Sequence, residues 1–145
     1  MKGLIQRVKR ASVTIDGKVY SEINQGILIL LGVEKGDNEQ NADKLADKLC
    51  KLRIFEDEDG KMNKSILDVN GEILIVSQFT LAGDCKKGTR PSFDKAELPQ
   101  RANELYEYFV DLIKQKNIPV GTGVFGAMMD VELVNDGPVT FMLEF

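Results

Sequence analysis

The sequence predicts an α+β fold in a single domain, residues 1–145, with a β-barrel-like, mostly antiparallel or mixed sheet and two main helices. Strand-like segments outnumber helical ones along the chain, as expected of an α+β domain. There is no internal repeat, low-complexity tract or linker, and 145 residues are enough to bury one core. The elements are taken below in chain order.

The chain begins with strand-forming sequence. Leu4–Arg10 alternates only loosely, but Val13–Ile15 and Val19–Tyr20 flank Asp16-Gly17-Lys18, which is typical of a β-hairpin. Gly26–Val33 is a continuous apolar run bounded by glycines. Such a run predicts a central strand that is buried on both faces.

Two later segments repeat apolar side chains at helical spacing. In the first, Asp37–Leu52, either Asp37 or Asn38 is placed to cap the free N–H groups at the start of a helix. In the second, Leu98–Ile113, Pro99 lies near the first turn, where its missing N–H costs little. We therefore expect one helix in each segment.

The remaining elements are strands and one long loop. Arg53–Phe55 is expected to return to strand, and Glu72–Val76 to form a buried strand that ends at Ser77. Ala82–Ala96 is too long and too polar for a tight turn, so it is a candidate functional loop. Three strands are expected to close the chain: Val120–Phe125, Met128–Val134 and Val139–Phe145.

Composition excludes several classes of protein. No apolar run approaches the ~20 residues of a membrane span, and the N-terminus has no signal-peptide core, so we expect a cytoplasmic protein. Cys50 and Cys85 form no C-x-x-C pair and are expected to be free thiols. The chain contains no histidine, the usual catalytic base and zinc ligand, and the acidic run Glu56–Asp59 has no EF-hand spacing. We expect no metal and no cofactor.

A polar segment follows the apolar strand that ends at Ser77. Ser77, Gln78 and Thr80 stand where strand ends often present functional groups, although a polar edge capped by hydroxyls would give the same sequence. Thr80 could attack as a nucleophile, but its proton has no obvious acceptor without histidine. The backbone N–H groups around Phe79 and Thr80 could instead stabilise an oxyanion.

A second polar segment interrupts the last strands at Gly137-Pro138. A turn is the simplest interpretation. An X-Pro bond can also be cis, which would place two carbonyl oxygens on one side and suit an ammonium group. The stretch Thr122–Met129 is compatible with close strand packing or with a pocket wall.

The formal charge of −4 argues against general attraction to nucleic acid, but the charge is unevenly distributed. Residues 1–20 are basic, residues 34–59 are acidic, and a second basic cluster of Lys86, Lys87 and Arg90 follows the first polar segment. Such clusters can hold phosphates, or they can be ordinary solvated surface.

Taken together, five blocks in this order resemble the D-aminoacyl-tRNA deacylase family, also called D-tyrosyl-tRNA deacylases, from Met1 to Phe145. The blocks are Gln6-Arg7-Val8 with Ala11-Ser12-Val13, Ser77-Gln78-Phe79-Thr80-Leu81, Arg90-Pro91-Ser92-Phe93, Thr122–Met129, and Asn135-Asp136-Gly137-Pro138-Val139-Thr140.

The resemblance implies a cytoplasmic homodimer that hydrolyses the ester joining a D-amino acid to the 3′ end of tRNA. It implies a cis Gly137-Pro138 bond that enters the partner subunit's pocket and holds the substrate's ammonium group. The residues it assigns are Gln78, Phe79 and Thr80 to catalysis, and Ser77, Met129, Gly137 and Pro138 to substrate binding. We add Arg7 and Lys87 as candidate tRNA contacts.

Selectivity and chemistry follow as hypotheses. With ammonium and ester fixed, an L side chain would strike the carbonyl pair, while D side chains and glycine would enter, so glycyl-tRNA mischarged on tRNA-Ala is a further expected substrate. The resemblance favours help from the tRNA 2′-hydroxyl, with Thr80 as a rival nucleophile. Two other classes remain open: a non-catalytic RNA-binding module, and an esterase or amidase of small D-aminoacyl compounds.

Overall fold

The long strand β1 (Lys2–Ile15) organises the sheet of the computed structural model, which describes all residues 1–145. Along one edge of β1, its first half pairs antiparallel with β3 (Gly26–Gly32) and its second half pairs antiparallel with β2 (Lys18–Ile23). Along the other edge, β1 pairs antiparallel with β8 (Asp130–Glu144). Beyond β3 the sheet continues in parallel through β6 (Glu72–Ser77) and β7 (Val120–Thr122). This mixed sheet confirms the predicted fold class.

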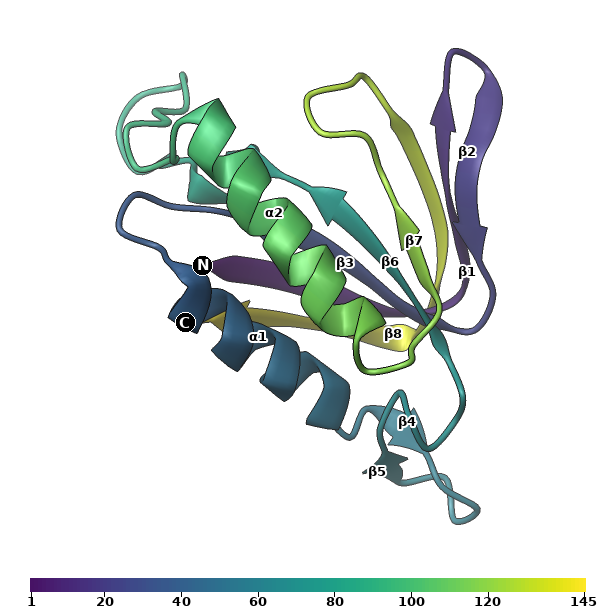
Figure 1. Cartoon of the computed structure of the whole chain (residues 1–145). Helices are drawn as coiled ribbons and strands as arrows, with labels where there is room; N and C mark the ends of the chain where they lie inside the picture. Colours follow the sequence, from purple (N-terminus) through teal and green to yellow (C-terminus); the bar gives the residue numbers. More distant parts are fainter.

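The sheet curls until its two ends meet (Figure 1). The hydroxyl of Ser21 on β2 donates to the carbonyl oxygen of Thr122 on β7 at 2.6 Å, which joins the first strand of the order to the last. Gly26 begins the parallel pair of β3 and β6, where a Cβ would lie 1.8 Å from the carbonyl oxygen of Glu72. No other residue fits this backbone approach.

The β1–β2 hairpin and the central strand are where the sequence places them. Asp16 and Gly17 both have positive φ, 50° and 73°, which matches the twist of a two-residue hairpin turn. β3 lies between β1 and β6 and is buried over nearly its whole length.

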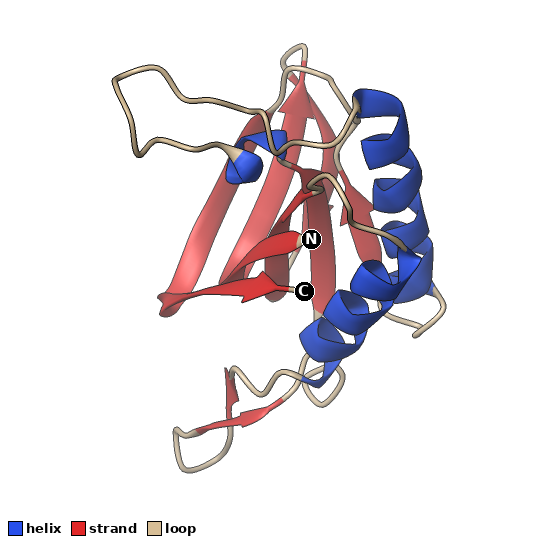
Figure 2. Ribbon diagram, turned by 90° about the vertical axis from the view of Figure 1, so that its left-hand side faces the viewer, coloured by secondary structure: helices blue, strands red, loops and turns tan.

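Two helices cover one face of the sheet, α1 (Glu39–Lys51) and α2 (Pro99–Lys114) (Figure 2). Asn38 is the cap of α1, because its side chain accepts from the N–H of Gln40 at 2.9 Å while Asn41 accepts from the N–H of Asn38. The helices bury their apolar faces against β3 and β6 in a core that includes Leu45, Leu49, Leu105, Phe109 and Ile75.

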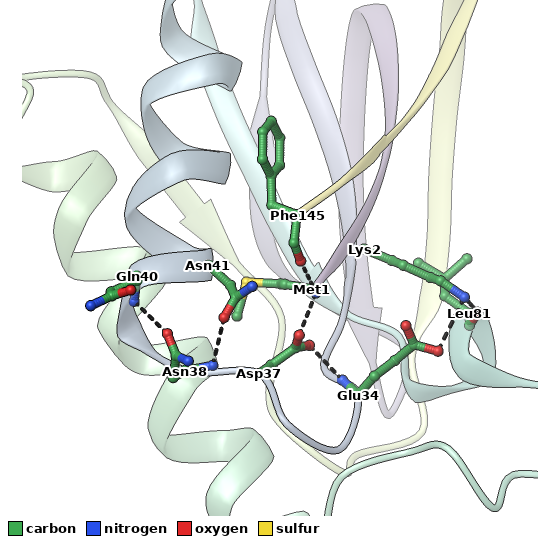
Figure 3. A network of polar contacts seen from close by, with 9 residues as sticks. All are labelled: Met1, Lys2, Glu34, Asp37, Asn38, Gln40, Asn41, Leu81 and Phe145. Carbon is green, nitrogen blue, oxygen red and sulfur yellow. Dashed lines mark hydrogen bonds and ion pairs between the residues drawn. The ribbon is translucent and has the colours of Figure 1, made fainter.

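Asp37, the other candidate cap, instead pairs with the N-terminus in a network that also holds the C-terminal residue (Figure 3). Its carboxylate pairs with the buried ammonium group of Met1 and accepts from the N–H of Glu34 at 2.7 Å. The same ammonium group donates to the carbonyl oxygen of Phe145, and the N–H of Phe145 donates back to Met1 at 3.0 Å. Lys2 extends the network to Glu34 at 3.1 Å and to the carbonyl oxygen of Leu81 at 3.4 Å.

Asp37→Ala should lower the free energy of unfolding by about 3 kcal/mol, because it leaves the ammonium group of Met1 buried without its anion. Urea unfolding followed by circular dichroism measures the change. Asp59→Ala is the control, since Asp59 is exposed and its carboxylate has no partner. Equal stability of the two variants would contradict the role given to Asp37.

Several strand boundaries differ from the sequence prediction. The strand expected at Arg53–Phe55 is only β4 (Phe55–Glu56), which pairs with β5 (Met62–Lys64) in a separate small sheet. β7 ends at Thr122, short of the expected Phe125. The last two predicted strands form the single strand β8, because both halves pair with the same long strand β1. No helix is long and apolar enough to cross a membrane.

The two cysteines are free thiols in different surroundings. Burial raises the pKa of Cys50 to about 11, so this thiol stays protonated near neutral pH, whereas Cys85 lies in an exposed loop. We expect a thiol reagent to label Cys85 alone in the folded protein and both cysteines in guanidinium chloride. Rapid labelling of Cys50 in the folded state would contradict the burial.

Candidate functional site

The carboxyl end of β6 opens into a cavity of about 520 Å³. One wall is the turn after β6, the opposite wall is the loop between β7 and β8, and the first turns of α2 close a third side. The main lining residues are Ser77, Gln78, Phe79, Glu97, Pro99, Ala102, Phe125, Met128, Met129 and Val131. The size suits a small organic group, and the lining is mostly apolar with a few polar groups.

The first wall presents unused backbone donors. After Ser77 the chain forms the short 3₁₀ helix η1 (Phe79–Ala82), which leaves the N–H groups of Phe79 and Thr80 without an acceptor in the chain. Gln78 is fixed because its N–H donates to the carbonyl oxygen of Leu31 at 2.8 Å. Free N–H groups on a fixed turn are suited to bind a carbonyl oxygen or an oxyanion.

The hydroxyl of Thr80 is also part of this turn. The side-chain amide of Gln78 donates to the oxygen of Thr80, and no acidic or basic side chain contacts that hydroxyl. Nothing in the chain is therefore placed to take the proton of Thr80, which is what a nucleophilic hydroxyl needs.

The opposite wall is held by sulfur and backbone contacts. The N–H of Gly123 donates to the carbonyl oxygen of Ile75 at 3.0 Å, and the N–H of Val124 points to the sulfur of Met129 at 3.3 Å. Tyr106 on α2 donates to the same carbonyl oxygen of Ile75 at 2.8 Å, and burial raises the pKa of this phenol to about 12. Tyr106 is therefore a neutral donor that joins α2 to β6, the strand whose end opens into the cavity.

The second polar segment forms a bulge in β8 opposite Arg7. Gln6 pairs with Thr140 and Val8 pairs with Asn135, so Arg7 faces the whole segment 136–139. The side chain of Asn135 closes the bulge: its oxygen accepts from the N–H of Val139 at 2.8 Å, and its amide donates to the carbonyl oxygen of Val139 and to the hydroxyl of Thr140, both at 3.1 Å.

The tip of this bulge is the pair Gly137 and Pro138, both exposed to solvent. The peptide bond between them is cis. They lie within a strand and not in a turn between two strands, which corrects the simplest interpretation of the sequence. The bulge arises because β8 has more residues than β1 can pair across this stretch.

Arg7 is the support of the bulge and is only 4% exposed. Its guanidinium group donates to the carbonyl oxygens of Asp136 at 2.7 Å and of Ile54 at 2.6 Å, and it lies 3.5 Å from the carboxylate of Glu56. The expectation that Arg7 contacts a tRNA phosphate does not fit this burial. A basic block in the sequence does not reveal which of its side chains points inward.

The structure brings together some of the expected site residues and separates others. Ser77, Gln78, Phe79 and Met129 line one cavity, and Thr80 lies next to it on η1. Gly137 and Pro138 do not line this cavity, and Lys87 lies in the exposed loop before α2.

Sequence reasoning missed several residues of the cavity, of which Glu97 and Ala102 are the most informative. Glu97 is its only ionisable lining residue, and Ala102 was assigned only to the apolar stripe of the second helix. The sequence did hold one signal for Ala102, because its small side chain stands among larger apolar ones on the second helix. A small side chain leaves room for a ligand against the helix.

Comparison with known proteins identifies the family. The model of the family described as D-Tyr-tRNA(Tyr) deacylase matches residues 4–144. The D-aminoacyl-tRNA deacylase of Geotalea daltonii is 60% identical over 144 residues, covering 99% of this chain and 96% of the relative. That of Aquifex aeolicus is 57% identical over 144 residues, covering 99% and 97%.

Two solved structures have the same fold. One, described as "c-Myc DNA Unwinding Element Binding Protein", superposes with a TM-score of 0.95 at 42% identity and covers 100% of this chain and 99% of that one. The other, described as "Structural Analysis of a probable eukaryotic D-amino acid tRNA deacylase", gives a TM-score of 0.85 at 16% identity and covers 99% and 98%. The resemblance carried by the five sequence blocks is confirmed, and the chain belongs to the D-Tyr-tRNA(Tyr) deacylase family.

Proposed function

We propose that this chain hydrolyses the ester of D-aminoacyl-tRNA, releasing the free D-amino acid and tRNA, and that it rejects L-aminoacyl-tRNA. Family membership makes it a deacylase, a hydrolase of aminoacyl esters. The observation that carries the proposal to this molecule is a cavity next to two free backbone donors, those of Phe79 and Thr80, where no acidic or basic side chain contacts the hydroxyl of Thr80. Such a site can promote hydrolysis of an ester when the attack is made by water or assisted by a group of the substrate itself.

In this proposal the ester carbonyl lies against η1. The N–H groups of Phe79 and Thr80 donate to the oxygen that becomes negative as the tetrahedral intermediate forms. Ser77 and Met129 border the aminoacyl group, and the half-exposed ring of Phe79 offers the terminal adenine a surface to stack on.

We further propose that the functional unit is a homodimer in which one subunit completes the site of the other. The bulge that carries Gly137 and Pro138 is exposed, braced by Asn135 and Arg7, and remote from the cavity lining of its own chain. A braced, exposed tip of this kind is suited to enter the cavity of a second copy. There its two carbonyl oxygens would accept from the substrate ammonium group.

Selection by handedness follows from this arrangement. If the ammonium group and the ester are both held, inversion at the α-carbon exchanges the hydrogen atom and the side chain. An L side chain then meets the rigid carbonyl pair, while a D side chain points away from it. Glycine has no side chain to exclude, so glycyl-tRNA, including that mischarged on tRNA-Ala, should also be hydrolysed. Aminoacyl-tRNA is used in the cytoplasm, which is where we place the protein.

The test is the rate of ester loss from matched D- and L-aminoacyl-tRNA with purified protein. We expect rapid loss of the D ester and no acceleration of the L ester over the spontaneous rate. Free D-amino acid esters serve as a third substrate, and equal turnover of these would identify a small-molecule esterase instead. Equal hydrolysis of D- and L-aminoacyl-tRNA would overturn the proposal.

A second candidate is nucleic-acid binding without turnover. It is favoured by the similarity to the 42% identical solved structure, whose name describes a protein that binds a DNA unwinding element. Binding of tRNA or DNA that leaves the D-aminoacyl ester intact would support this function over hydrolysis.

A further inference from the structure

The loop between η1 and α2 carries a group of unpaired cations. Lys86, Lys87, Arg90 and Lys95 are all exposed, and none of them takes part in an ion pair of the chain. The three acidic residues of the loop, Asp84, Asp94 and Glu97, each accept a hydrogen bond from a neighbouring group and pair with none of these cations. The carboxylate of Asp84 accepts from the N–H of Lys86 at 2.9 Å, and that of Asp94 accepts from the hydroxyl of Ser92 at 2.7 Å. With four cations and three carboxylates the loop has a net charge of 4 − 3 = +1, on a chain whose total charge is −4.

The loop is attached to the candidate site. The backbones of Asp84 and Ser92 exchange two hydrogen bonds, at 2.8 and 3.0 Å, which close its base. The ring of Phe93 packs against the ring of Phe79 with centroids 5.1 Å apart. Figure 2 shows the loop projecting beyond the sheet next to the short helix η1. The backbone that carries these cations is therefore held at a fixed position relative to the cavity.

A second hollow of about 400 Å³ lies on the other side of η1. Three lysines, Lys2, Lys86 and Lys95, line it together with Ala82–Cys85. Lys2 is held in place by Glu34 at 3.1 Å and by the carbonyl oxygen of Leu81. Lys86 and Lys95 are the unpaired cations of the hollow, beside one carboxylate, that of Asp84. Phe79, at one end of η1, borders the first cavity, and Ala82, at the other end, borders the second.

The separation of the two hollows suits a continuous polyanion. The four residues of η1 span roughly 6 Å at about 2 Å per residue, a distance that a nucleotide step of an extended strand can cover. An aminoacyl-adenosine in the first cavity would thus place the phosphates of the preceding nucleotides over η1 and toward the lysines. Because the chain as a whole is acidic, phosphate attraction depends on local groups of cations such as this one.

We propose that Lys86 and Lys95, with the hollow they line, bind the phosphodiester backbone of the single-stranded 3′ end of tRNA. This inference rests on the proposed function, since it is the ester in the first cavity that brings the strand across η1. It assigns the patch to phosphate contact, which positions the strand without reading its bases.

The experiment compares Lys86→Gln/Lys95→Gln with the control Lys44→Gln/Lys48→Gln. The control lysines are exposed on α1, form no ion pair and change the charge equally. KM for D-aminoacyl-tRNA is measured over a range of salt concentrations, beside D-aminoacyl-adenosine, which has no phosphate. In the loop variant KM for the tRNA substrate should rise several-fold, and the slope of log KM against log salt should fall by about 1.4, the value for two single-strand phosphate contacts.

Two outcomes would overturn this inference. One is a loop variant with the same KM and salt slope as the control. The other is an equal rise in KM for D-aminoacyl-adenosine, which would place the effect in the first cavity. If the unaltered protein fails to hydrolyse D-aminoacyl-tRNA, the proposed function fails separately. The patch is then tested by the Kd for uncharged tRNA, which must rise in the loop variant and stay unchanged in the control.

Discussion

Hydrolysis of D-aminoacyl-tRNA should slow by about 100-fold or more when the terminal adenosine is replaced by 2′-deoxyadenosine. The physical reason is that no side-chain base contacts the turn that would hold the ester. The chain has no histidine, and Glu97, the only ionisable residue that lines the cavity, has its one hydrogen bond with the N–H of Leu98 at 2.7 Å and none with Phe79 or Thr80. A hydroxyl on the substrate, next to the ester, is then the nearest group that can assist attack.

Thr80→Val is the matched protein variant. It removes the hydroxyl but keeps the shape of the side chain and the backbone N–H group, so we expect the rate to stay within about threefold of the unaltered protein. The measurement is the single-turnover rate for both tRNA substrates with both proteins. A large loss with Thr80→Val and none with the deoxy substrate would assign the chemistry to Thr80 and contradict the account.

Asn135→Ala should reduce the rate of hydrolysis by about 100-fold, because a shift of about 1 Å in a positioning group can cost that much. Asn135 makes three side-chain hydrogen bonds across the bulge around Gly137 and Pro138, beside the one that Arg7 donates to Asp136. Without them the carbonyl oxygens of the tip lose their fixed position. The variant should also be less stable by about 2 kcal/mol, since the N–H of Val139 loses its acceptor.

Thr140→Ala is the control for Asn135→Ala. It removes the hydrogen bonds that the hydroxyl accepts from Asn135 and Gln6 and leaves the two that join Asn135 to Val139, so we expect a rate within about threefold of the unaltered protein. Rates are measured well below the unfolding temperature of both variants, which separates lost geometry from lost fold. Full activity of Asn135→Ala would show that the bulge does not need this brace.

The fold was largely predictable because its strongest signals are local. The hairpin at Asp16-Gly17, the buried strand β3 and both helices follow from turn chemistry and apolar periodicity, and each is where the sequence places it. The end of the chain was mispredicted because a bulge and a turn share the same residues, Gly and Pro. Only the pairing of β1 with both halves of β8 distinguishes them.

The candidate site was predictable to a smaller degree. Ser77, Gln78 and Phe79 follow a recognisable strand end, so their presence at a cavity could be expected. The burial of Arg7 could not, because its partners are backbone carbonyl oxygens at Ile54 and Asp136, which leave no pattern in the sequence. Loop residues such as Glu97 line the cavity only because of tertiary packing, which no local sequence pattern indicates.

The claim that one subunit completes the site of the other is tested most directly by mixing two inactive variants. Asn135→Ala disables the bulge, and Ala127→Trp fills the cavity, which Ala127 lines. When the two are co-expressed in equal amounts, half of the dimers should be mixed and each should contain one intact site, so about a quarter of the unaltered activity should return. Activity no higher than that of either variant alone would show that bulge and cavity act within one chain and would contradict the account.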